Sequence, residues 1–190
     1  MPCASSLAEV AGVHREQKRL AALNVVGGLL VLGSYWLAFA GSPELRTGLW
    51  GGVPESLRPL YTVNMLLAAA GYFPFTALLL FATRPETGLP GGRSYRLLHG
   101  LYALILIPSA LWLPLTARML AEPSGLLWAA IRIDLALVGL GSTGLLVLLF
   151  AIARRRRDAF GWAAFAGILP FWLQTAVLDA LVWPAYFPWP

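Results

Sequence analysis

The sequence predicts an all-α fold, a polytopic membrane bundle of five transmembrane helices. Of its 190 residues, 58% are hydrophobic and only 12% are charged, and the mean hydropathy is +0.70. A soluble domain carries roughly a quarter charged residues, and a water-soluble protein of this size would have to expose much of its apolar surface. The composition therefore excludes a soluble enzyme, a disordered tail and a nucleic-acid-binding module.

Five apolar runs are each long enough to cross the hydrocarbon core, which takes about 20 helical residues. They cover residues 21–40, 60–82, 97–117, 126–153 and 159–187. A polar segment, residues 1–20, precedes them, and residues 21–190 are expected to form one five-helix transmembrane domain. The first three runs contain no charged residue, whereas the fourth contains Arg132 and Asp134 and the fifth contains Asp179.

Basic residues divide unequally between the segments that connect these runs. With the amino terminus inside, the inner segments carry ten of them: Arg15, Lys18, Arg19, Arg84, Arg93, Arg96 and Arg154 to Arg157. The outer segments carry Arg46, Arg58 and Arg118. Because cytoplasmic loops are enriched in Lys and Arg, this bias predicts an amino terminus inside and a carboxyl terminus outside. The four consecutive arginines fit anionic lipid headgroups better than nucleic acid, so the expected partner is the lipid bilayer.

The first run allows a second interpretation. Ala38-Phe39-Ala40 before Gly41 resembles a signal-peptidase site after a basic region. The apolar run is long for a signal peptide, however, and about twenty polar or mixed residues precede it. We therefore expect an uncleaved helix, with cleavage as the alternative.

Polar and aromatic side chains within the runs gather in the predicted outer half of the bundle. The candidate ligand-binding residues are Trp36, Asn64, Trp112, Arg132, Asp134, Asp179 and Trp183. A charge in hydrocarbon is costly unless it is paired, hydrated or able to reach the interface. Two interpretations follow. Either these residues line a ligand cavity, with Arg132 paired to Asp179 across the fourth and fifth helices, or they form an ordinary interfacial belt of aromatic and snorkelling side chains.

No sequence pattern indicates catalysis or a bound metal. Cys3 is the one cysteine, which excludes an internal disulfide and a cysteine metal cluster, and His14 and His99 are far apart. The sequence contains no nucleotide-binding loop, Ser/His/Asp set or catalytic pair of carboxylates. We therefore expect neither an enzyme nor a resident cofactor.

Three short motifs in the carboxyl half carry a family resemblance. They are Leu111-Trp112-Leu113-Pro114-Leu115, the segment Ile133-Asp134-Leu135-Ala136-Leu137-Val138, and Pro170-Phe171 followed by Leu178-Asp179 and Trp183. They resemble the third, fourth and fifth helices of the translocator-protein family, the tryptophan-rich sensory proteins (TspO/MBR). The resemblance covers roughly half the chain. Asp179 stands where that family has Asn, and the Trp- and Pro-rich stretch before the second helix is absent.

The resemblance implies a five-helix bundle that binds porphyrins, sterols or other flat apolar molecules between its helices. We therefore expect a small membrane protein with an outer-half cavity for a tetrapyrrole, sterol or lipid, where aromatic rings stack on the ligand and Arg132 meets a carboxylate. The alternatives are an assembly subunit of a membrane complex, packed through glycine-rich faces, and a small transporter. The expected location is a bacterial inner membrane or an equivalent organelle membrane, and a homodimer is a further expectation.

Overall fold

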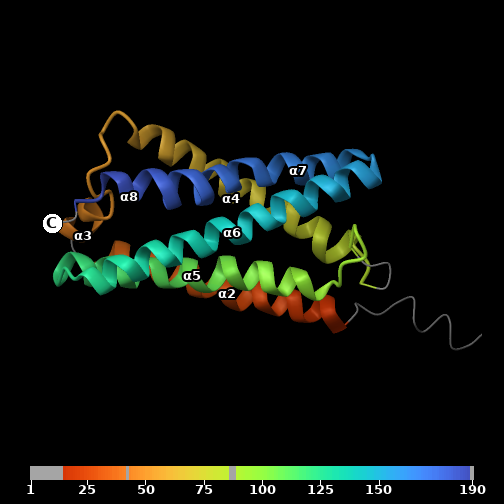
Figure 1. The fold of residues 1–190 in the computed structure, drawn as a ribbon, viewed down its shortest axis with the longest axis horizontal. Helices are drawn as coiled ribbons and strands as arrows, with labels where there is room; N and C mark the ends of the chain where they lie inside the picture. Colours follow the sequence, from red (N-terminus) through yellow and green to blue (C-terminus); the bar gives the residue numbers. More distant parts are fainter. Residues whose placement is uncertain (1–14, 42, 86–88, 189–190) are drawn as a thin grey trace, which may run out of the picture.

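The computed structural model describes residues 15–41, 43–85 and 89–188, and their regular elements are all helices (Figure 1). Five helical segments are long and apolar enough to cross a membrane, as predicted. They are α2 (Arg15–Ala40), α4 (Arg58–Ala77) with η1 (Leu78–Ala82), α5 (Arg96–Ala121), α6 (Gly125–Arg156), and α7 (Ala159–Trp172) continued by η2 (Leu173–Val182) and α8 (Trp183–Tyr186). A short helix, α3 (Pro43–Gly48), follows α2. Residues 1–14 of the predicted polar segment lie outside the described residues.

The spanning helices pack as a ring. Helix α5 lies against α2 and α6, and α7 lies against α6 and α4, while a smaller contact between α2 and η1 closes the ring. In Figure 1, α4 and α7 form one side of the bundle, α2 and α5 form the other, and α6 crosses between them. Because every spanning helix is mainly apolar, the ring leaves one side of each helix for contact with its neighbours and the other side for lipid.

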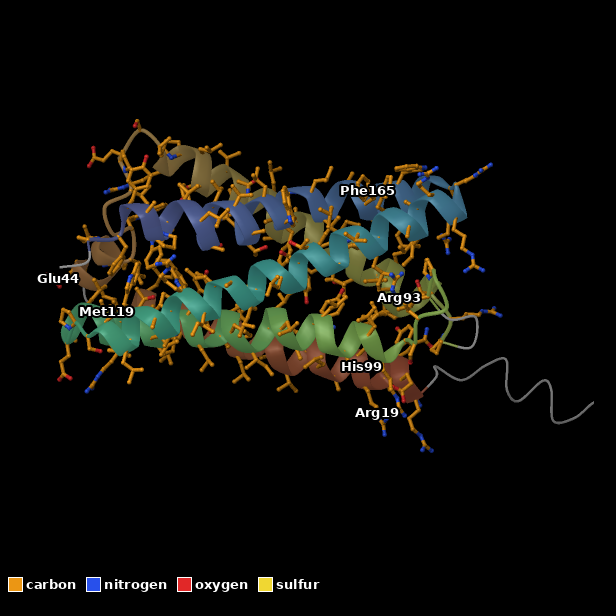
Figure 2. The ribbon with its side chains drawn as sticks, viewed as in Figure 1. Arg19, Glu44, Arg93, His99, Met119 and Phe165 are labelled. Carbon is orange, nitrogen blue, oxygen red and sulfur yellow. The ribbon has the colours of Figure 1, made fainter. Side chains whose placement is uncertain are left out.

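The two ends of the bundle differ in composition. The start of α2, the connection before α5 and the turn between α6 and α7 lie at one end, while α3, α8 and the turn between α5 and α6 lie at the other (Figure 1). We call these the basic end and the aromatic end. Figure 2 shows Arg19, Arg93 and His99 at the basic end, and Glu44 and Met119 at the aromatic end. The arginine-rich turn and α8 therefore lie at opposite ends, as the single span between them requires.

Two glycines allow α4 and α7 to pack with their backbones in contact. A Cβ atom at Gly71 would lie 2.2 Å from the carbonyl oxygen of Gly167, and one at Gly167 would lie 2.7 Å from that of Gly71. Small residues at membrane helix interfaces permit this close approach. Nearby, the hydroxyls of Thr76 and Tyr102 share a hydrogen bond of 2.9 Å inside the main core.

Side chains from α2, from α6 and from the residue before α5 bind the carbonyl groups at the end of η1. Gln17 donates to the Leu80 oxygen over 2.8 Å, Tyr95 to the Leu79 oxygen over 2.8 Å, and Arg156 to the Ala82 oxygen over 3.1 Å. The last carbonyls of a helix have no partner within it, so these bonds replace the missing ones. Burial, followed by the nearby Glu16 carboxylate, raises the pKa of the Tyr95 phenol to about 12, which keeps its donor proton in place.

Candidate ligand-binding cavity

A cavity of about 180 Å³ lies at the aromatic end of the bundle. Helices α2, α3, α4, α5, η2 and α8 all contribute to its wall, together with the chain that follows α3. Its lining residues are Tyr35, Phe39, Arg46, Leu49, Trp50, Tyr61, Met65, Trp112, Leu113, Gln174, Asp179 and Trp183. The wall is therefore mostly aromatic and aliphatic, with few polar groups.

The aromatic rings of the wall contact one another. Trp112 and Trp183 meet edge to face with their centroids 5.7 Å apart, and Tyr35 lies 6.4 Å from Trp112. On the other side, Trp50 meets Tyr61 edge to face at 6.2 Å. Edge-to-face pairs are favourable because the positive ring edge of one residue meets the negative face of the other. These contacts hold the rings in fixed positions around the cavity.

The segment after α3 is fastened to α8, which closes one side of the cavity. The Trp183 indole donates to the Leu49 oxygen over 3.0 Å, and the Gly52 amide donates to the Tyr186 oxygen over 3.0 Å. A Cβ atom at Gly52 would lie only 2.2 Å from that Tyr186 oxygen, so the close approach requires glycine. The wall formed by Leu49 and Trp50 is thus held by backbone contacts as well as by ring packing.

A chain of hydrogen bonds runs from α4 to the carboxylate of Asp179. The Asn64 amide donates to the Pro170 oxygen over 3.1 Å and to the Gln174 side-chain oxygen over 2.9 Å. Gln174 in turn donates from Nε2 to Oδ1 of Asp179 over 2.8 Å. Among the described residues, Oδ2 of Asp179 has no hydrogen-bond partner. The chain orients this half-buried carboxylate on the cavity wall.

The π-helical geometry of η2 makes this arrangement possible. Its i→i+5 hydrogen bonds bring residues five positions apart to nearly the same side of the helix, whereas an α-helix brings positions three and four apart together. Gln174 and Asp179 are five apart and both line the cavity. Short π-helical segments are rare and frequently mark functional sites.

Three buried polar atoms near the cavity have no hydrogen-bond partner among the described residues. They are Nε1 of Trp112, Oγ1 of Thr116 and Oδ2 of Asp134. A Cβ atom at Gly141 would touch Leu101 and Ile105, which fixes the register of the antiparallel helices α5 and α6. Two turns nearer the aromatic end, this register places Asp134 level with Trp112. Unpartnered buried polar groups are uncommon, and here the three lie in the same part of the α5–α6 interface.

The structure separates the seven predicted site residues into three groups. Trp112, Asp179 and Trp183 line the cavity, and Asn64 supports it through Gln174. Asp134 is buried between α5 and α6, behind the wall. Trp36 and Arg132 lie outside: the Trp36 side chain is 75% exposed and the Arg132 side chain is exposed on α6.

The predicted Arg132–Asp179 ion pair does not form. Asp179 turns toward the cavity, where Gln174 is its hydrogen-bond partner, and the exposed Arg132 pairs with no described acid. The physical reason is that Arg132 lies within two turns of the start of α6, so its long side chain can reach the interface along the lipid-facing surface. Arg46 of α3, rather than Arg132, supplies the arginine of the cavity wall.

Several cavity residues were not among the predicted ones. Gln174 carried a usable signal, because a polar side chain in the middle of an apolar run is costly and often functional. Tyr35 and Tyr61 lie at the depth of an ordinary interfacial belt and have no such signal. Arg46 and Trp50 lie in the connection between two spans, and their position depends on how that connection folds back onto α8.

Comparison of the chain with protein-family models, with curated proteins and with solved structures returns no match. The resemblance to the TspO/MBR family therefore stays a hypothesis based on the three motifs in the carboxyl half.

Proposed function

We propose that this small multi-pass membrane protein binds an apolar, ring-containing molecule in the cavity at its aromatic end. The aromatic wall carries the proposal: Tyr35, Trp50, Tyr61, Trp112 and Trp183 all line one cavity. Ligand sites are typically apolar and aromatic with a small number of convergent polar groups. The polar group that Asp179 provides is held in place by Gln174 and so fits this description.

The size of the cavity limits the ligand. Its volume is about 180 Å³, below the roughly 300–1,000 Å³ of sites for drug-sized ligands. An apolar cavity of about 150 Å³ accommodates a benzene ring. The cavity therefore suits one ring or two fused rings, and a tetrapyrrole or sterol would enter it with only part of its ring system.

The TspO-like resemblance supports the same proposal. Trp112, Asp179 and Trp183, which belong to the motifs of the third and fifth helices, are also lining residues of the cavity. A bundle that binds flat apolar molecules between its helices would use such positions. We therefore propose a TspO-like binding role for a ligand smaller than a porphyrin.

A radioligand experiment tests the proposal. The protein is reconstituted in lipid nanodiscs, and binding of tritiated naphthylmethanol is measured by scintillation proximity, with empty nanodiscs subtracted. We expect saturable binding that weakens about tenfold or more in Met65→Trp, because the larger side chain fills the cavity. Met65 is a partly exposed lining residue, so the bulk can be accommodated without opening the core.

Leu66→Trp is the matched control. Leu66 is 68% exposed, is not a lining residue and lies one position from Met65 on α4. The same side chain introduced there should leave binding unchanged. Absence of saturable binding, or equal binding by the two variants, would contradict a ligand site in this cavity.

Assembly and transport are the alternative roles. An assembly subunit would co-purify with a stoichiometric partner in mild detergent, and a transporter would produce a flux of the probe in proteoliposomes. Neither is favoured by a specific contact in the described part of the chain. That the protein is not an enzyme also stays a prediction.

A further inference from the structure

We infer that the ligand of this cavity is an organic cation, a protonated amine attached to a small apolar ring system. The inference rests on the proposed function, since it names the ligand class for the same site. Asp179 places a carboxylate on the cavity wall, and among the described residues only its Oδ1 has a hydrogen-bond partner, Gln174. Its Oδ2 is therefore left for a donor that enters the cavity.

Among the described residues, no basic side chain forms an ion pair with the Asp179 carboxylate. Arg132 is exposed on α6, and Arg46 lines the cavity as an exposed residue of α3 without an ion pair to any described acid. Asp134, the other acid within the spans at this end, is buried at the α5–α6 interface and supplies no positive charge. A carboxylate within a membrane span is stabilised by a counter-charge, and an ammonium group on the ligand would provide one.

The aromatic wall favours the same ligand. The face of an aromatic ring attracts a cation that lies within about 6 Å of its centroid, and Trp is the strongest of the three aromatic residues. Tyr35, Trp112 and Trp183 form one connected wall in the cavity that also holds Asp179. At this end of the bundle a cation already takes such a position, since Arg58 Cζ lies 5.6 Å from the Trp50 ring centroid. Rings and carboxylate together form an aromatic cage with one acidic group.

Arg46 sets the orientation of the ligand. Its like charge would oppose a cation, but its side chain is exposed, so solvent and salt weaken that repulsion. Asp179 lies about one helical turn deeper than Trp183, whereas α3 caps the aromatic end. The amine is therefore expected to enter first, with the apolar ring following between the aromatic side chains.

Three probes with the same ring and different head groups test the inference. Naphthylmethylamine carries a positive charge, naphthylmethanol is neutral and naphthoate is negative. We expect the amine to bind wild-type protein more tightly than the other two. Asp179→Asn should weaken amine binding about tenfold or more, because it removes a charge-assisted hydrogen bond, and should leave the alcohol within about twofold. Asp134→Asn is the matched control and should change neither affinity.

The results that would overturn the inference differ from those that would overturn the proposed function. Amine binding no tighter than alcohol binding, or an equal loss of both in Asp179→Asn, would overturn the cationic ligand while leaving a ring-binding cavity. Tightest binding by naphthoate, abolished by Arg46→Gln, would also overturn it and would indicate an anionic ligand. Failure of all three probes to bind would instead reject the cavity itself.

A second variant covers the case in which Asp179→Asn does not fold. Arg46→Gln removes an exposed like charge, and we expect it to raise the ratio of amine affinity to alcohol affinity by about two- to threefold at low salt. Unchanged or weaker amine binding in Arg46→Gln, together with no preference for the amine in the wild type, would overturn the inference.

Discussion

Gln174 donates a hydrogen bond to Asp179 over 2.8 Å, although the two residues are five positions apart in one helix. The π-helical segment η2 places them on one side of the helix. Asn64 of α4 donates a hydrogen bond to the side-chain oxygen of Gln174 over 2.9 Å. The direction of the Asp179 carboxylate therefore depends on the backbone geometry of one span and on a side chain of another.

Asn64 and Gln174 should be energetically coupled. Asn64→Leu and Gln174→Leu each leave a buried polar partner unsatisfied, and each should lower the free energy of unfolding by about 1–3 kcal/mol. The double variant should lose less than the sum, by roughly 1 kcal/mol, which is the scale of hydrogen bonds between membrane helices. Unfolding in mixed micelles with increasing SDS measures all four proteins. Strict additivity would contradict the hydrogen-bond chain.

The five spans could be predicted because a membrane helix needs only length and apolar composition, both of which are local properties of the sequence. The depth of each polar residue followed from the same counting. The side of the helix on which each residue lies could not be predicted from this counting. Gly27 is buried against Leu106, and Trp36, nine positions later, lies about half a turn around α2 and faces outward. Packing partners decide that direction, and they are known only from the fold.

The cavity itself was only partly predictable for a second reason. Asp179 could be identified because a charge in an apolar run is costly, but its partner Gln174 depends on the π-helical hydrogen bonds of η2. No local pattern in the sequence of η2 distinguishes it from an α-helix. Trp50 reaches the wall because the chain after α3 folds back to α8, a contact between residues more than a hundred positions apart.

Arg132 and Asp179 should act independently. They share no partner in the described structure, so the effects of Arg132→Gln and Asp179→Asn on the free energy of unfolding should add within about 0.5 kcal/mol. The same SDS titration measures both single variants and the double variant. A double variant more stable than the Asp179→Asn protein alone would indicate a charge pair, which the exposed position of Arg132 argues against.

Gly71 should tolerate no side chain. In Gly71→Ala the new methyl group would lie 2.2 Å from the Gly167 oxygen, so α4 and α7 must separate, at a cost of about 1–3 kcal/mol or more in stability. Gly28→Ala is the matched control, because nothing lies within 4 Å of a Cβ atom there, and it should change stability by less than about 0.5 kcal/mol. Thermal unfolding in detergent compares the two. Equal effects would contradict the close packing of α4 and α7.

Asp158 should stabilise the turn between α6 and α7 only while it is ionised. Arg156 donates to its carboxylate over 2.6 Å and the Gly161 amide over 2.7 Å, and these bonds lower the pKa of Asp158. Because the pKa of Asp158 is lower in the folded state, its stabilisation of the fold is fully present when the pH is above the ordinary Asp pKa, about 3.9. That stabilisation is lost as the pH falls through the lower pKa of the folded state.

The variant Asp158→Asn isolates this charge, since Asn also caps helices well. Wild type should unfold at a higher temperature than the variant at about pH 7, and the difference should shrink at about pH 3. Added salt should reduce it as well, because the carboxylate is exposed. A difference that stays constant from neutral to acidic pH would show that the charge makes no contribution.

The basic end should face the cytoplasm. Ten basic residues in the segments at that end, against three in the segments at the aromatic end, predict this orientation. With Cys3 replaced by Ser, single cysteines are introduced at Arg155 of the basic end and at Glu55 of the aromatic end, both exposed. A membrane-impermeant maleimide applied to intact cells should label the Glu55→Cys protein at once and the Arg155→Cys protein only after permeabilisation. The reverse order would invert the topology, and labelling of both sites in intact cells would contradict the three spans between Glu55 and Arg155. In this orientation the cavity, which lies at the aromatic end, would be accessible to ligands from the outer leaflet or the external solution.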